Sequence, residues 1–239
     1  MELDKQNITF LADIKSRFNM GEHQTLDARE FLGFLGRILE TANTNVLAAG
    51  QDNNNRGMGT TCTLVALRGR KLYYAHVGDS RAYLIRQGRM RQITTDHSWV
   101  QESVDAGILT AQEARTHPNR NVITRAVGLD PDVKVDLGSH ELKSGDLIVL
   151  CSDGLNSMIS DAAIENMTHL CSDNDLCQAL VNAAKEAGGD DNITVITARV
   201  GRSESLNEEY VDLSARDTVD IESDDSIFNK FRGLFRNTK

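Results

Sequence analysis

The chain has 239 residues, 40% of them hydrophobic, and a formal net charge of −9 at pH 7. These values are ordinary for a soluble globular protein and exclude collagen-like, low-complexity and wholly disordered chains. No run approaches the roughly 18 apolar residues of a membrane span, and the first residues lack the features of a signal peptide. We therefore expect a cytoplasmic protein.

Charge is distributed unevenly along the chain. Residues 203–226 carry nine acidic side chains and one arginine, whereas residues 227–239 carry four basic side chains and no acidic one. The preceding body is mildly acidic and has no basic run of the kind that nucleic-acid binding requires, so no nucleic-acid partner is expected. We predict a folded domain over residues 1–200 and a disordered acidic linker over residues 201–226. Residues 227–239 form a basic amphipathic segment that either docks on its own body or contacts a membrane surface or a protein partner.

The first half of the body predicts one helix, then strands. Apolar residues recur at helical spacing over residues 31–46, and Asp27 stands three residues before Glu30, as in a capping box. Residues 60–67, 72–77 and 81–86 have strand-like patterns separated by glycines, which we interpret as an antiparallel meander. Residues 96–124 then predict a polar helical excursion between strands.

The second half of the body is predicted to contain further strands, with helices between them. Residues 146–151 form a continuous apolar run that suits a strand buried on both faces. Helical stretches are expected from Ser160 and over residues 174–187, followed by a last strand over residues 193–200. The fold class is therefore α/β with mostly antiparallel strands. The four cysteines include no CxxC pair, and we expect them to be reduced and structural: Cys62, Cys151, Cys171 and Cys177.

Three aspartates stand at the ends of predicted strands, each within two residues of a glycine: Asp79, Asp153 and Asp191. Taken singly, each fits an ordinary turn, because Gly-Asp and Asp-Gly are common turn dipeptides. Together they are more informative, because several strand ends can meet at one rim of a packed sheet. Crowded carboxylates either take up protons or hold a cation. Oxygen-only ligands suit Mg²⁺, Mn²⁺ or Ca²⁺, so a metal site and three unrelated turns both remain open.

Six segments resemble, in order, motifs of bacterial members of the protein phosphatase 2C family. They are GMGTT at 57–61, LYYAHVGDSRAY at 72–83, TDHS at 95–98, HPNRNVITRAVG at 117–128, LCSDGL at 150–155 and GDDNITV at 189–195. The resemblance covers roughly residues 40 to 200. It implies a four-layer αββα sandwich of two mostly antiparallel sheets flanked by helices. It also implies a metal-dependent protein phosphatase that hydrolyses phosphoserine and phosphothreonine by metal-activated water, with phosphorylated proteins from a Ser/Thr kinase as substrates.

The resemblance also assigns roles to individual residues. Asp153 and Asp191 match ligands of the family's binuclear centre, which takes Mn²⁺ or Mg²⁺. Asp79 matches the aspartate that helps to hold a third, weaker ion. The helical excursion overlaps the family's flap beside the active site. No protein nucleophile is implied, and the chain contains no Gly-x-Ser-x-Gly motif.

The N-terminal region departs from the family pattern. Members of the family begin with a strand that carries a phosphate-binding arginine and an acidic pair, and a second strand follows that ends in Asp-Gly-Met-Gly-Gly. This chain contains none of these motifs, so the sandwich is expected to be N-terminally incomplete. The nearest remnant is the run at residues 8–13, where Asp13 is either the bridging metal ligand or a turn aspartate. Two alternatives to a normal enzyme follow: a pseudophosphatase that binds a partner or phosphoprotein without turnover, and a truncated form of an enzyme.

Four further polar residues near these motifs are expected to be structural. Arg81 is predicted to pair with Asp79 or with a neighbouring carboxylate. Oxygen-ligated sites seldom use imidazole, so packing or capping is predicted for the three histidines of the motifs: His76, His97 and His117.

Overall fold

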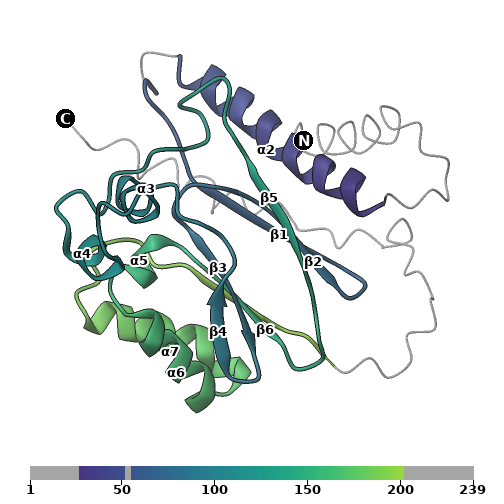
Figure 1. The fold of residues 1–239 in the computed structure, drawn as a ribbon, viewed down its shortest axis with the longest axis vertical. Helices are drawn as coiled ribbons and strands as arrows, with labels where there is room; N and C mark the ends of the chain where they lie inside the picture. Colours follow the sequence, from purple (N-terminus) through teal and green to yellow (C-terminus); the bar gives the residue numbers. More distant parts are fainter. Residues whose placement is uncertain (1–26, 52–54, 202–239) are drawn as a thin grey trace, which may run out of the picture. The chain divides into compact units, whose positions relative to one another are not determined.

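The structure is a computed structural model that describes residues 27–51 and 55–201 (Figure 1). It contains two antiparallel sheets with helices against the outer face of each. The predicted αββα arrangement is therefore confirmed for this part of the chain. Asp13, the acidic linker and the C-terminal amphipathic segment all lie outside the described residues. No helix within the described ranges is both long and apolar enough to cross a membrane.

Helix α2 (Ala28–Ala49) covers the first sheet, and its start follows directly from the local sequence. The side chain of Asp27 accepts hydrogen bonds from the backbone N–H groups of Arg29 and Glu30, both at 2.8 Å. The Glu30 carboxylate in turn accepts from the Asp27 N–H at 2.9 Å, which completes the predicted capping box. Leu35 and Leu39 on one face of the helix are buried against the sheet.

The first sheet has the order β1-β2-β5, with β1 (Cys62–Arg68), β2 (Lys71–Val77) and β5 (Asp136–Glu141). Strand β2 is central, and its side chains alternate between the two faces. Tyr73, Ala75 and Val77 pack under α2. Leu72 and Tyr74 point the other way, into the layer between the sheets. Both faces of β2 are therefore covered. A strand covered on both faces needs apolar residues at most positions, as the sequence of β2 has.

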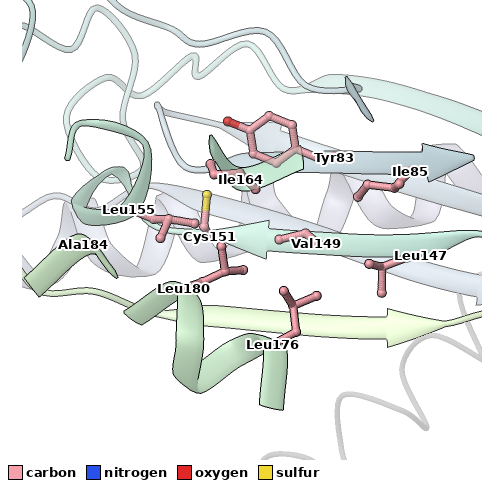
Figure 2. Packing of buried hydrophobic residues seen from close by; sticks show 10 residues of the cluster. All are labelled: Tyr83, Ile85, Leu147, Val149, Cys151, Leu155, Ile164, Leu176, Leu180 and Ala184. Atoms are coloured by element: carbon pink, nitrogen blue, oxygen red, sulfur yellow. The ribbon is translucent and has the colours of Figure 1, made fainter. Parts of the chain in front are cut away.

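The second sheet has the order β4-β3-β6-β7, with β3 (Arg81–Arg86), β4 (Arg89–Gln92), β6 (Leu147–Cys151) and β7 (Val195–Arg199). Its outer face packs on α5 (Asp153–Asn156), α6 (Asp161–Leu170) and α7 (Asp173–Glu186). Figure 2 shows Tyr83 and Val149 on the strands, with Leu176 and Leu180 of α7 in the same buried cluster. Ile148, on the opposite face of β6, is buried between the two sheets.

The predicted meander is wrong in one respect. Strands β1 and β2 form a hairpin, but β3 pairs with β4 and β6 in the other sheet. The chain crosses between sheets at Gly78, whose φ of +117° favours glycine. A side chain there would collide with Thr61. Apolar residues on both faces of β2 and β3 do not specify which strand each will pair with, so the pattern alone could not exclude a single sheet.

The flap, strand β6 and the cysteines agree with the sequence-based expectations. Helices α3 (Trp99–Asp105) and α4 (Ala111–Thr116) form the helical excursion, which we call the flap, defined as residues 98–124. Strand β6 is buried along its length except at Leu150, which is partly exposed. All four cysteines are free thiols, as predicted, and burial raises the pKa of Cys151 to about 12.

Candidate active site

Three connections end at one rim of the second sheet. Asp79 follows β2, Asp96 precedes the flap, and Asp153 begins α5 directly after β6. Arg81 pairs with Cys151 in the β3–β6 register, so the start of β3 and the end of β6 are adjacent. This register brings Asp79 and Asp153 to the same end of the sheet although they are far apart in the sequence.

A cavity of about 300 Å³ opens between this rim and the flap. The rim contributes the carboxylates of Asp79, Asp96 and Asp153, and the start of α6 contributes that of Asp161. The flap contributes Gln101, Arg115, Arg120 and Asn121, with the aliphatic side chains of Val100 and Val104. The cavity thus has an acidic floor and a wall with two arginines.

Asp79 and Asp153 share an environment that disfavours their charged forms. Burial, followed by repulsion from Asp153, raises the pKa of Asp79 to about 6. The pKa of Asp153 is also raised, first by burial and then by repulsion from Asp191. Among the described residues, no cationic side chain forms an ion pair with either carboxylate. Both groups therefore lie in a place where a cation would be stabilising.

Arg81 forms ion pairs with the other two carboxylates of the cavity, those of Asp96 and Asp161. Its Nε and Nη2 atoms donate to the two oxygens of Asp96 at 2.9 and 2.7 Å, and its Nη1 lies 3.3 Å from Asp161. Gln92 adds a further donor to Asp96 at 2.8 Å. Of the two pairings predicted for Arg81, the structure shows the one with a neighbouring carboxylate. These hydrogen bonds raise the pKa of Arg81 against the effect of its burial.

Asp191 approaches the site from the loop before β7, but it does not line the cavity and its side chain is exposed. Close packing of two backbone segments brings it near Asp153. The hydroxyl of Ser152 donates to the Asn192 carbonyl at 3.0 Å and accepts from the Thr194 N–H at 3.0 Å. A side chain at Gly154 would collide with the Asn192 carbonyl, so the approach requires glycine there.

The carboxylates of Asp79 and Asp153 have the donor chemistry that Mn²⁺ and Mg²⁺ prefer. Within residues 27–51 and 55–201, however, no three His, Cys, Asp or Glu side chains are gathered closely enough to hold an ion. A complete ligand set therefore needs water or further groups. The assignment of Asp79, Asp153 and Asp191 as metal ligands remains a prediction.

The three histidines do not line the cavity. His76 is fully buried, with its ring nitrogens 2.9 Å from the Thr63 hydroxyl and 3.0 Å from the Thr95 carbonyl. Burial, then the neighbouring His97, lowers the pKa of His76 to about 4. His97 accepts from the Gly78 N–H at 3.0 Å, and His117 ends α4. These are the packing and capping roles predicted for them.

Asp96 is one of the cavity residues that the sequence analysis did not single out as candidates. It lies within the TDHS segment at 95–98, but nothing in its local pattern distinguishes it from other loop aspartates. Its role depends on Arg81 and Gln92, which reach it from β3 and β4.

Comparison with known proteins gives the family. The protein phosphatase 2C model matches residues 11–103. Over 179 residues the chain is 43% identical to the protein phosphatase PhpP of Streptococcus pneumoniae, covering 74% of this chain and 70% of that protein. The chain belongs to the protein phosphatase 2C family. The Listeria innocua serine/threonine phosphatase stp, another relative, is 35% identical over 72% of this chain and 69% of its own length.

Solved structures support the same family fold. The serine/threonine phosphatase of S. agalactiae superposes with a TM-score of 0.70 at 38% identity, over 80% of this chain and 78% of that one. Stp1 from Staphylococcus aureus superposes with a TM-score of 0.71 at 34% identity, over 79% and 74% of the two chains. A catalytic domain of PstP that superposes with a TM-score of 0.67 at 33% identity, over 82% and 79%, was solved with two manganese ions.

Proposed function

We propose that this phosphatase 2C family member hydrolyses phosphoserine and phosphothreonine in proteins, using Mn²⁺ or Mg²⁺ held by Asp79, Asp153 and Asp191. The observation that carries the proposal is the pair of partly buried carboxylates, Asp79 and Asp153, which face one cavity and form no ion pair with any cationic side chain that the structure describes. The serine/threonine phosphatases among its relatives and the manganese in PstP support the same assignment.

Each part of the cavity has a task in this reaction. Bound divalent ions supply an activated water and neutralise charge on the phosphoryl group. Asp153 and Asp191 would hold the two ions of the binuclear centre, and Asp79, which lines the cavity with Asp153, would help to hold a third, weaker ion. Water would fill the remaining ligand positions. Arg81 offsets one of the two negative charges of Asp96 and Asp161, so this pair repels an incoming phosphate less than two unpaired carboxylates would.

The deciding experiment measures turnover of a phosphothreonine peptide by this chain as Mn²⁺ is titrated after chelator treatment. Saturable, Mn²⁺-dependent release of phosphate is the expected result. Tight binding of the phosphopeptide with no turnover at any Mn²⁺ concentration would instead support the pseudophosphatase. Mg²⁺ in a parallel titration shows which ion the site prefers.

Three finer predictions belong to the same proposal. The substrates are products of a Ser/Thr kinase, the protein works in the cytoplasm, and residues 227–239 contact a membrane surface or a protein partner. Deletion of residues 227–239 tests the last point. It should remove salt-sensitive binding to anionic vesicles or to the partner and leave phosphopeptide turnover unchanged.

A further inference from the structure

The flap wall of the cavity carries two positively charged side chains. Arg115 and Arg120 both line the cavity, and both side chains are exposed. Neither forms an ion pair within residues 27–51 and 55–201. Glu113, the acid on α4, already accepts hydrogen bonds from the N–H and hydroxyl of Thr110 at 2.8 Å.

The third arginine of the cavity is different. Arg81 donates to Asp96, Asp161 and the Tyr83 hydroxyl, so its guanidinium has little left to offer a ligand. Arg115 and Arg120 are therefore the cavity's available guanidinium groups. A guanidinium presents a planar set of donors that matches a carboxylate or a phosphoryl group, often with two hydrogen bonds.

The two sides of the cavity differ in charge, and this difference favours one orientation of a bound substrate. The floor is acidic and accepts a phosphoryl group only together with divalent ions, whereas the flap wall attracts an anion directly. Gln101 and Asn121 add neutral hydrogen-bonding groups to the same wall. A second anion on the substrate is repelled by the floor and attracted by Arg115 and Arg120.

We propose that Arg115 and Arg120 form a subsite for a second anionic group, a carboxylate or a second phosphoryl group, next to the phosphorylated residue of the substrate. The proposal rests on the proposed phosphatase function and narrows its substrate class to acidic or multiply phosphorylated segments. Both arginines are solvent-exposed, so the preference weakens as salt screens the charges.

The test compares three phosphothreonine peptides of equal length, with flanking alanines, flanking aspartates, or a second phosphothreonine. Values of kcat/KM are measured at saturating Mn²⁺ and low salt. We expect the anionic peptides to be cleaved about tenfold better than the alanine peptide, a difference of about 1.4 kcal/mol. In the double variant Arg115→Gln, Arg120→Gln this ratio should fall to near one, whereas the double lysine variant should keep a large part of it.

Arg70→Gln is the matched control, because Arg70 is exposed in the turn between β1 and β2 and does not line the cavity. It removes one positive charge elsewhere and should leave all three rates unchanged. A preference for the doubly phosphorylated peptide alone would support the subsite and assign it to phosphoryl groups. Equal cleavage of the three peptides by the wild type, or an unchanged ratio in the glutamine variant, overturns the subsite alone. No cleavage of any peptide overturns the proposed function as well.

Discussion

The carboxylates of one cavity are held in two different ways. Asp96 and Asp161 share the guanidinium of Arg81, whereas Asp79 and Asp153 have burial and mutual repulsion around them and no ion pair among the described residues. A carboxylate that is already neutralised belongs to the scaffold. One that is buried without a counter-ion is stabilised by whatever cation arrives. The difference separates the residues that build the site from those that are expected to work in it.

Removal of a carboxylate that is proposed to hold metal should have the largest effect. We expect Asp153→Asn or Asp191→Ala to lower Mn²⁺-dependent kcat/KM by more than about 100-fold, because lost charge stabilisation acts on the transition state. The fold should persist, as judged by circular dichroism. Asp190→Asn, which changes an exposed carboxylate beside Asp191, is the matched control and should retain activity. Full activity of Asp153→Asn at saturating Mn²⁺ would refute its assignment as a ligand.

Disruption of the paired group should affect stability most. Arg81→Gln leaves Asp96, which is 9% exposed, without its guanidinium partner, and we expect a loss of about 3–5 kcal/mol in the free energy of unfolding. Urea denaturation measures it. The control is Arg199→Gln, which breaks an ion pair with Asp173 whose side chains are 38% and 47% exposed. That change should cost no more than about 1 kcal/mol. Equal losses in the two variants would mean that burial of the Arg81–Asp96 pair does not increase its contribution to stability.

The contact that brings Asp191 towards Asp153 can be tested at Gly154. We expect Gly154→Ala to destabilise the fold by about 1–3 kcal/mol and to weaken Mn²⁺ activation, because the new methyl group pushes the Asn192 backbone away. Gly33→Ala is the comparison, since its methyl group would meet only the end of Arg37 on the surface of α2. That variant should be neutral or more stable by up to about 1 kcal/mol. Wild-type Mn²⁺ activation in Gly154→Ala would mean that the close approach does not matter to the site.

The smallest expected effect is a change in pH dependence. The pKa of Asp79 is about 6 in the folded protein and 3.8 ordinarily, so the folded chain holds its proton to higher pH than the unfolded chain. Ionisation of Asp79 therefore lowers the free energy of unfolding above its ordinary pKa, and this loss of stability grows as the pH rises from about 4 to about 6. In the metal-free protein, Asp79→Asn should remove the part of the pH-dependent fall in the free energy of unfolding that Asp79 causes. Parallel stability curves for wild type and variant between pH 4 and 7 would exclude the effect.

Much of the local structure could be predicted from the sequence. The capping box at Asp27, the buried run of β6 and the flap helices depend on residues within a few positions of one another. Two strands were missed. β4 has the polar sequence RMRQ, and β5 is half-buried with a glycine at Gly138. In both strands exposed residues alternate with half-buried ones, so neither strand has an apolar run.

The candidate site was predicted only in part. Asp79 and Asp153 do line one cavity, and the glycines beside them were the signal that singled them out. The sequence motifs also offered Asp191, which the structure places outside the cavity, near Asp153. The sequence could not single out Asp96, Asp161 or the flap arginines, because the role of each depends on residues that other elements bring close to it.

The sequence by itself determined where most helices and strands begin and end, and its ordered motifs determined the family. Only the tertiary structure decided that β2 and β3 lie in different sheets, and that Arg81 pairs with Asp96 and Asp161 rather than with Asp79. The reason is physical. Helix and strand periodicity arises between neighbours along the chain, whereas strand pairing and ion pairing depend on which of several chemically similar groups come into contact on folding.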